Sequence, residues 1–553
     1  MIGVVADEAE HCVVAEFFEL FKTPWEFHRP GAHYDVLICS NGLVPKNKAR
    51  LLFLYGARRQ AFEECRSLGT GSASRHDLLS FRGERMPIYG SCLLFDSPGN
   101  EVVIHERTKS AAAVSVTAGD QMVVRLGFDL FEEVRYLLTR GQPAEFASIP
   151  TLDLHISLLR ELIVSQGVSL VEILPVPAAC SFIACLTHDV DHPRMRHHKC
   201  DYTMFGFLYR ALMGSVIDFC RGKRSLQQVA TNWKAAISLP LVFAGIAKDF
   251  WDQLDQYLEL EGDLASTFFI IPTKGKPGID SSGRIRARRA SRYALADVAE
   301  DLKKLLFTNR EIAVHGIDAW RDSVSGRDER EAIQQVTGAS DEIGIRIHWL
   351  YFDSQAPLSL EKAGFSYDST VGYNETIGYR AGTTQVFKHP NVDHLLELPL
   401  HIMDTALFYP SYMNMSDDRA RAAMVPLIEN VTRFGGVLTI NWHDRSLGPE
   451  RLWGDFYVSL LNNLRAKKPW FATAAQTVSW FRNRRETSFD SATRDGRKIR
   501  VQPANNRLAN DAVNLPPLVV RVYNRGGSTR DLCDRSVFED FTIDTCDSLL
   551  IAA

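Results

Sequence analysis

The sequence contains no run of about eighteen uncharged apolar residues, so it predicts no membrane-spanning helix. The most apolar stretch of the middle region, 235–246, is too short to cross a bilayer and is expected to form a buried helix. No basic segment followed by an apolar run opens the chain. Acidic residues stand where a secretion signal would be apolar, which predicts a cytoplasmic location.

Paired cysteine motifs are also missing. The ten cysteines are scattered, no two of them form a CxxC pair, and their spacing matches no zinc ribbon. We therefore expect mostly reduced thiols that pack as small hydrophobic side chains. Neither sign of charge dominates, because 63 Lys and Arg stand against 67 Asp and Glu, so no nucleic-acid partner is expected. The oligomeric state stays open.

At 553 residues the chain is too long for one ordinary core. Residues 1–175 mix helical and strand-like runs and predict an α/β domain of unknown role, with antiparallel strands within 81–125. Residues 176–485 form the predicted catalytic domain, which an insertion at about 194–263 interrupts. Residues 486–553 predict a linker followed by strands, which form a small β appendage or join an earlier sheet.

The predicted catalytic domain alternates apolar strands with amphipathic helices. The expected strands are 181–187, 266–271, 311–314, 346–351, 395–400, 436–441 and 470–473. The expected helices are 294–307, 329–343, 417–434 and 450–467. Repeated strand–helix units predict a parallel sheet, either a barrel or a doubly wound sheet, whose active site lies at the carboxyl ends of the strands.

Polar residues cluster just after these strands. Asp189 and Asp191 follow the first strand, and because they stand two residues apart on an extended chain, both side chains point to the same side. His315 and Asp318 follow the third strand, and His443 follows the last strong one. Three strand ends that each release His or Asp are hard to explain by packing, so we expect one carboxylate to hold a metal while the other stays free as a base.

A family resemblance rests on segments that occur in a fixed order. They are THDVD at 187–191, VHGIDAW at 314–320, GYRAG at 378–382, LELPLHIMD at 396–404 and NWHD at 441–444. The series resembles the motifs of the polysaccharide deacetylases, also called the NodB-homology or carbohydrate esterase family 4 group. The resemblance implies an α/β fold, a distorted (β/α) barrel, that performs metal-assisted hydrolysis of an N-acetyl group.

The resemblance also implies roles for matching residues. Asp189 matches the general base, His443 the general acid, and Arg380 the arginine that orients the base. Asp191 and His315 match metal ligands, and the implied cofactor is a divalent metal, commonly zinc.

The sequence departs from the family pattern at the second metal histidine, because that position is Ala319. Catalytic zinc usually has three protein ligands, so a substitute is expected. Asp318 is the first candidate, since a residue three positions after the first histidine can share its helical face. His188 and His192 are alternatives, although strand alternation turns both away from Asp191.

Other polar and aromatic residues receive weaker predictions. Trp320 is the preferred sugar platform, and Tyr379 and Trp442 are further candidates for substrate contact, although helical spacing around Trp442 favours core packing. The role of Asp404 stays open. Asp444 is expected to be solvated, with orientation of the neighbouring histidine as the alternative.

The leading prediction is therefore a carbohydrate-active hydrolase that removes N-acetyl groups from an N-acetylhexosamine-containing polysaccharide or its precursor, in bacterial exopolysaccharide biosynthesis. Ala319 favours an alternative, an inactive scaffold that binds glycans after losing its metal. A third hypothesis keeps the fold and changes the substrate to another non-peptide C–N bond of a small amide. A large glycan cleft against a closed small pocket would separate the first hypothesis from the third.

Overall fold

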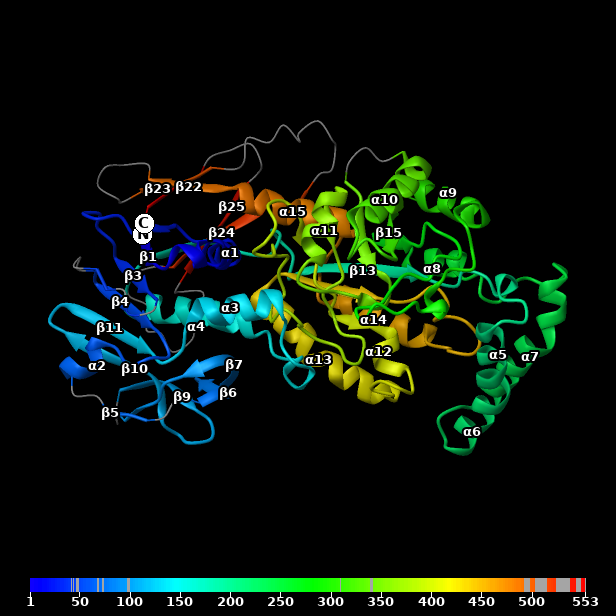
Figure 1. Cartoon of the computed structure of the whole chain (residues 1–553), viewed down its shortest axis with the longest axis horizontal. Coiled ribbons are helices and arrows are strands. Elements are labelled where there is room, and N and C mark those ends of the chain that lie inside the picture. Colours follow the sequence, from blue (N-terminus) through cyan, green and yellow to red (C-terminus); the bar gives the residue numbers. More distant parts are fainter. Residues whose placement is uncertain are drawn as a thin grey trace. The chain divides into compact units, whose positions relative to one another are not determined.

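The computed structural model of the chain describes residues 1–553 except 41, 43, 46–48, 67–68, 72–73, 97–99, 309, 339–341, 492–497, 503–514, 524–537, 544–548 and 553. Its internal contacts divide it into two compact units, whose elements are labelled in Figure 1. The first unit comprises 1–179, 379–390 and 479–553, and the second comprises 180–378 and 391–478. Much of the predicted linker, at 492–497 and 503–514, lies outside the described residues.

The first unit is built on a mixed sheet in the order β2-β1-β3-β4-β11-β10-β9-β6-β7. Its strands are β1 (Ile2–Val5), β2 (Trp25–Phe27), β3 (Val36–Cys39), β4 (Leu51–Tyr55), β6 (Ser74–Phe81), β7 (Glu84–Cys92), β9 (Glu101–His105), β10 (Ala111–Ala118) and β11 (Gln121–Leu126), with β5 (Gly69–Thr70) and β8 (Phe95–Asp96) beside them. Pairing is parallel from β2 to β11 and antiparallel from β11 to β7, as the alternating runs within 81–125 predict.

The helices of the first unit are α1 (His11–Phe21), α2 (Ala61–Arg66), α3 (Leu130–Thr139) and α4 (Thr151–Ser165). The C-terminal segment joins this unit through β24 (Leu518–Tyr523), which pairs antiparallel with β12 (Leu170–Ile173) on one side and with β25 (Phe538–Ile543) on the other. A further small sheet contains β22 (Ser488–Ser491), β23 (Lys498–Gln502) and β26 (Leu549–Ala552). Of the two expectations for the C-terminal strands, β24 and β25 follow the one in which they join an earlier strand.

The second unit is built on a parallel sheet in the order β18-β17-β16-β15-β14-β13-β20-β19, with β21 beside β13. Its strands are β13 (Ile183–Val190), β14 (Ser266–Ile270), β15 (Glu311–Gly316), β16 (Gly344–Ile347), β17 (Tyr367–Asp368), β18 (Leu396–Glu397), β19 (Ile402–Met403), β20 (Val437–Asn441) and β21 (Trp470–Phe471). All eight residues of β13 are buried, as expected for a strand covered on both faces.

Helices connect these parallel strands. They are α8 (Leu254–Glu261), α9 (Ala299–Phe307), α10 (Ser323–Thr337), α11 (Ala356–Ala363), α12 (Asp404–Phe408), α13 (Asp417–Phe434) and α14 (Gly454–Ala466); α15 (Ala474–Glu486) follows the last strand. The insertion between β13 and β14 forms α5 (Tyr202–Leu208), a π-helical turn (Tyr209–Gly214), α6 (Ser215–Cys220) and α7 (Leu226–Phe243). No helix among the described residues is long and apolar enough to cross a membrane.

The predicted distorted barrel is confirmed. The sheet ends at β18 on one side and at β19 on the other, and the short connection between these two strands bonds to the segment after β17 and to β20. The Leu400 amide donates to the Val371 carbonyl at 2.9 Å, and the His401 amide donates to the Thr439 carbonyl at 3.1 Å. An irregular segment therefore completes the ring that the regular ladders leave open.

Candidate active site

The carboxyl ends of three strands bring together a group of residues that can hold a metal ion. Asp191 follows β13, His315 lies near the end of β15, and His348 follows β16. One potential ligand atom from each residue lies within 4.8 Å of the others. The predicted strand 346–351 is wrong at both ends, because β16 stops at Ile347 and leaves His348 as the first residue of the following turn.

The donor atoms of this group face one another closely. Asp191 Oδ1 lies 3.3 Å from His315 Nε2 and 3.1 Å from His348 Nδ1, and the two ring nitrogens are 3.0 Å apart. Asp191 Oδ1 is buried, and these two imidazole nitrogens are its polar neighbours. A buried carboxylate oxygen that shares a small space with two imidazole nitrogens is a set of atoms that a cation can satisfy together.

The protonation of the two histidines suits a metal. His315 Nδ1 faces the Arg346 carbonyl at 2.9 Å, so Nδ1 carries the proton and Nε2 presents its lone pair to the group. Burial lowers the pKa of His348 to about 4, although the nearby Asp191 carboxylate partly raises it. The His348 ring is therefore neutral at neutral pH. Two imidazole nitrogens and one carboxylate oxygen form a donor set that zinc accepts. The residues present therefore fit a divalent metal.

The turn that carries His348 is held in an unusual conformation. The buried guanidinium of Arg289 donates from Nε and Nη2 to the His348 carbonyl, at 3.1 and 2.9 Å. The next two residues, Trp349 and Leu350, have φ angles of 67° and 52°, in the left-handed region that bulky residues rarely adopt. Local strain of this kind is found at functional sites, where the surrounding structure fixes it.

Asp189 lies beside the donor group and is fixed by two strands. Its Oδ1 accepts from Arg346 Nη1 at 2.9 Å, and its Oδ2 accepts from Asn441 Nδ2 at 2.8 Å. His315 Nε2 lies 3.7 Å from Oδ2. Burial by itself would raise the pKa of Asp189, but the electrostatic interactions with His315 and Arg346 hold it below its usual value, so the side chain is a carboxylate at neutral pH.

The arginine that bonds the predicted base is Arg346, which corrects the prediction of Arg380 for this position. Arg346 is fully buried, and it also donates from Nε to the Ser369 carbonyl at 3.0 Å. Arg380 belongs to the first unit, where its carbonyl accepts from the Gln142 amide at 2.7 Å. The motif match failed because Arg346 is the register partner of His315 across the sheet, and register is not visible in one segment.

His443 follows β20 and forms a dyad with Asp404. Its Nδ1 donates to Asp404 Oδ1 at 2.6 Å, and its backbone amide donates to Asp404 Oδ2 at 2.7 Å. Its Nε2 is directed toward Asp191 Oδ2, at 4.0 Å. Burial would lower the pKa of His443, but the Asp404 carboxylate raises it to about 9. Asp404, whose role the sequence left open, thus keeps the His443 ring protonated and oriented.

The positions of the side chains decide which of the candidates for a third metal ligand can reach the group. Asp318 accepts from the Ile279 amide at 3.1 Å and stays outside the group, so the prediction of Asp318 as a ligand is corrected in favour of His348. His188 points to the other face of β13, where its Nε2 lies 2.7 Å from Glu261 Oε1. The His192 ring is tilted against the Trp251 ring, with 6.1 Å between the centroids, and is likewise outside the group.

The predicted sugar-binding aromatic residues are buried. Trp442 is fully buried and stacks on Tyr457, which is the core packing that its spacing favoured. Trp320 is 3% exposed, and Tyr379 is buried in the first unit. None of these three described side chains therefore offers an open face for a sugar. Trp349, beside His348, is 40% exposed and was missed because it was placed inside a strand.

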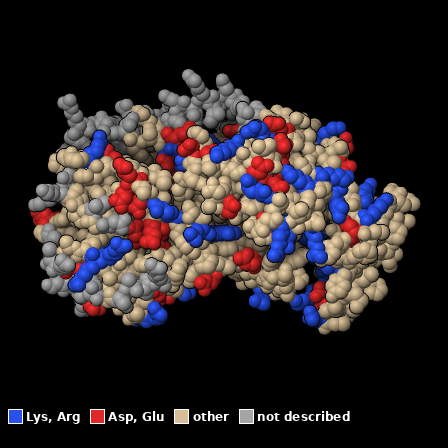
Figure 2. Space-filling model, viewed as in Figure 1, with Lys and Arg blue, Asp and Glu red and all other residues tan. Residues whose placement is uncertain are grey.

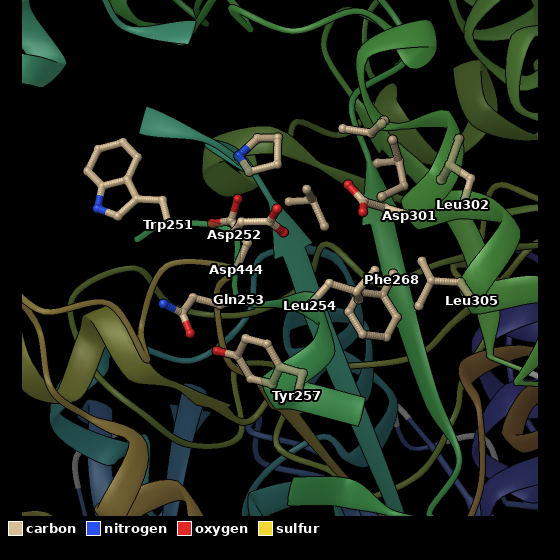
Figure 3. A pocket seen from close by; sticks show the side chains of 14 residues that line it. Trp251, Asp252, Gln253, Leu254, Tyr257, Phe268, Asp301, Leu302, Leu305 and Asp444 are labelled. Atoms are coloured by element: carbon tan, nitrogen blue, oxygen red, sulfur yellow. The ribbon is translucent and has the colours of Figure 1, made fainter. Parts of the chain in front are cut away.

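Asp444 is buried, which corrects the expectation of a solvated side chain. Its Oδ2 accepts from the His192 amide at 2.8 Å, and burial raises its pKa to about 7. Figure 3 shows Asp444 among the side chains that line a pocket, and most of the others are apolar, such as Leu254 of α8, Leu302 of α9 and Phe268 of β14. Strand alternation places this pocket behind the site, because Val190 lines it and lies between the inward-facing Asp189 and Asp191.

No protein-family model and no curated protein matches the sequence. Solved structures with a similar fold include a chain described as a polysaccharide deacetylase from Mycobacterium smegmatis, which is 18% identical over 56% of this chain and 95% of that chain, with a TM-score of 0.33. The Puue allantoinase is 15% identical over 55% of this chain and 91% of its own, with a TM-score of 0.33.

PdaA of Bacillus subtilis, a family 4 carbohydrate esterase, is 8% identical over 56% of this chain and 85% of its own, with a TM-score of 0.27. Polysaccharide deacetylases and family 4 esterases are thus among the structural neighbours of this chain. All three likenesses are too distant to carry a function across, so the chemistry of this chain has to follow from its own side chains.

Proposed function

We propose that this chain is a metal-dependent hydrolase that removes N-acetyl groups from an N-acetylhexosamine-containing glycan or its precursor. The observation that carries the proposal is the placement of a fixed carboxylate, Asp189, and an oriented imidazolium, His443, around one group of metal-ligating atoms. Hydrolysis of an amide needs these three parts: an electrophilic centre, a base for water and an acid for the departing amine.

Asp191, His315 and His348 would hold the metal ion, and zinc suits their donor atoms. When bound, such an ion polarises a carbonyl oxygen and lowers the pKa of water. Two buried arginines hold the metal-ligating histidines in place. Arg346 fixes the His315 ring through its carbonyl, and Arg289 fixes the turn that carries His348.

Asp189 is the proposed general base. Arg346 and Asn441 each occupy one of its carboxylate oxygens, and each oxygen keeps a further lone pair that can accept a proton from water. Two donors from different strands prevent rotation of the carboxylate. The side chain therefore needs no reorganisation when it takes a proton, which lowers the cost of the step.

His443 is the proposed general acid. The hydrogen bond from Nδ1 to Asp404 leaves Nε2–H directed into the site, where it can protonate the amine that leaves. The Asp404 carboxylate stabilises the imidazolium before the transfer and orients the ring throughout. Base and acid come from different strands, so each can act on its own side of the scissile amide.

Trp349 is the proposed contact for a sugar ring, in place of the buried Trp320. Its ring is partly exposed and adjoins the His348 ring, with 5.7 Å between the centroids.

We expect Trp349→Ala to raise KM about tenfold while kcat changes little, because an aromatic face binds a sugar equally well in the ground state and in the transition state. Steady-state kinetics on N-acetylated oligosaccharides measure this. Phe307→Ala, at an exposed aromatic residue of α9, is the matched control, and an equal KM for Trp349→Ala and wild type contradicts the assignment.

The direct test combines metal content with acetate release from N-acetylated oligosaccharides. The wild-type protein is expected to contain about one zinc per chain and to release acetate. His348→Ala is expected to lose both. Asp318→Asn, at the residue that the sequence favoured as third ligand, is expected to keep both, because the asparagine oxygen can still accept from the Ile279 amide.

Asp189→Asn separates chemistry from metal binding, since it is expected to keep the zinc and lose acetate release. If the protein binds metal but hydrolyses no N-acetylated glycan, the third hypothesis would replace the first, and the substrate would be a small amide with another C–N bond. A wild-type protein that takes up no metal but binds glycans would overturn the proposal and establish the scaffold alternative that Ala319 favoured.

A further inference from the structure

The insertion between β13 and β14 folds as a helical hairpin, defined here as residues 202–243 (Figure 1). One arm contains α5, the π-helical turn and α6, and the other arm is α7. A seam of buried side chains joins the arms. Its members include Met204, Phe207, Ala211, Ala235 and Leu239. One apolar row of each arm is therefore buried between the two arms of the hairpin.

Each arm carries a second apolar row that faces solvent. On the first arm the exposed residues are Tyr202, Phe205, Tyr209 and Met213, and on α7 they are Leu226, Trp233, Ile237 and Leu241. Their spacing of three, four or seven residues keeps each row on one side of its helix. Ile237 is 73% exposed and Trp233 is 45% exposed. So many large apolar side chains in one exposed element indicate an interaction surface and not chance exposure.

Each row lies on the side of its helix that is turned away from the seam. Phe205 is two residues from the seam residue Phe207, and Ile237 is two residues from the seam residue Ala235, so at about 100° per residue each stands about 200° around its helix from the seam. Figure 2 shows the hairpin end of the molecule as a largely uncharged surface bordered by Lys and Arg. Each arm of the hairpin thus has one buried and one exposed apolar row.

The charges of the hairpin are almost all positive. Residues 202–243 contain five Lys or Arg and one acidic residue, Asp218, although the whole chain has a net charge of -4. Arg224 pairs with Asp218 at 3.4 Å. Among the described residues, no carboxylate lies within ion-pair distance of the others, which are Arg210, Arg221, Lys223 and Lys234.

We propose that the hairpin binds the surface of a membrane that contains anionic lipids. An apolar face with unpaired cations beside it is the pattern of helices that lie in the interface of a bilayer. Tyr202, Tyr209 and Trp233 combine an apolar ring with a polar group, which suits the headgroup level. The unpaired cations complement anionic headgroups. Resting on the proposed function, this placement would present the active site to glycans held at a membrane.

The test is co-sedimentation of the full chain with vesicles. Vesicles of phosphatidylcholine with roughly one third phosphatidylglycerol are expected to bind the protein, and pure phosphatidylcholine to bind it at least about tenfold more weakly. The triple change Trp233→Gln, Ile237→Gln and Leu241→Gln is expected to weaken binding to the anionic vesicles by at least about tenfold. The pair Lys223→Glu and Lys234→Glu is expected to do the same and to remove the sensitivity to salt.

Phe307→Ser is the matched control, because Phe307 is 91% exposed on α9 and lies outside the hairpin. It is expected to bind vesicles like the wild type. Metal content and acetate release from a water-soluble oligosaccharide are expected to be unchanged in every hairpin variant, so a failure of the proposed function is seen separately. Equal binding by wild type and triple variant, or no binding to anionic vesicles, overturns the proposal. Dimerisation in solution that the triple variant abolishes, without vesicle binding, would assign the surface to a second copy of the chain.

Discussion

Arg346 serves two residues of the site at once. Its guanidinium bonds the Asp189 carboxylate, and its carbonyl accepts the proton of His315 Nδ1. The pairing is buried, so removal of the cation leaves a carboxylate that water cannot solvate. One side chain therefore sets both the charge of the proposed base and the tautomer of a metal ligand.

We expect Arg346→Met to raise the pKa of Asp189, because burial then acts with less opposition. The acid limb of the pH profile of kcat/KM should move to higher pH, with a loss of about a hundredfold in kcat/KM at neutral pH. Arg346→Lys keeps the charge but not the forked geometry, and it should shift the limb less. Arg380→Met, at the residue that the motif favoured, is expected to leave the limb in place. An unmoved acid limb in Arg346→Met would contradict the role of Arg346.

The Asp404–His443 dyad predicts a second pH effect, on the alkaline side. The pKa of His443 is raised from 6.5 to about 9, so the imidazolium is fully present below about 6.5 and is lost as the pH rises through about 9. Activity that needs this proton, and the stability that the ion pair contributes, should fall over the same range.

Asp404→Asn removes the charge that raises this pKa. We expect the alkaline limb of kcat/KM to move down to or below the ordinary histidine value of about 6.5, since burial then dominates. Asp418→Asn, at a carboxylate that is 97% exposed on α13, is the control and should leave the limb unmoved. A limb near pH 9 in the Asp404→Asn profile would show that another group is the acid.

At the scale of elements, β16 is the strand on which most of the site depends. It carries Arg346 and delivers His348, and it packs closely against the neighbouring strand β17. Gly344 opens β16 because a side chain there would meet the Tyr367 ring, with Cβ only 1.8 Å from Cζ. Tyr367 is buried and donates to Glu311 Oε1 at 2.6 Å, so its ring has no room to move.

We expect Gly344→Ala to lower the free energy of unfolding by about 3 kcal/mol, because the added methyl overpacks a closed strand pair. Urea unfolding measures this, and metal content should fall in the same variant since His348 is displaced. Gly206→Ala is the matched control on helix α5, where the nearest group is the flexible end of Arg210 at 3.2 Å. That control should be neutral or slightly stabilising. Equal stability of Gly344→Ala and wild type would refute the packing argument.

At the scale of the whole molecule, metal binding is expected to stabilise the folded second unit. Its three ligands lie at or just after the ends of β13, β15 and β16, which belong to one sheet. An ion that binds the folded chain and not the unfolded one stabilises it by mass action. The first unit contributes no residue to the described ligand group, so metal binding should act on the second.

Zinc at a hundred times its dissociation constant is expected to stabilise the second unit by about 2.7 kcal/mol, and a chelator should reverse this. Differential scanning calorimetry with and without zinc measures the shift. His348→Ala should show no shift, whereas Asp318→Asn should shift like the wild type. An equal shift in His348→Ala would place the metal elsewhere.

The sequence by itself located the polar residues at the ends of β13, β15 and β20. Asp189, Asp191, His315 and His443 could be found because a buried parallel strand is a continuous apolar run, and its end is marked by the first polar residues. The 3.6-residue period located α13 (Asp417–Phe434) to the residue. The helical insertion was visible as an interruption, but its exposed rows were not, because burial depends on what packs against a helix.

Only the tertiary structure decided which residues meet. Arg346 and His315 face each other through the register of β15 and β16, and register joins positions that are far apart in sequence. His348 was hidden because an apolar run does not reveal where a short strand turns. Asp404 meets His443, 39 residues further along the chain, only through the fold that brings the start of α12 to the loop after β20. Strand ends can be read from local apolar pattern, whereas hydrogen-bond partners follow from distances between strands, which no local pattern contains.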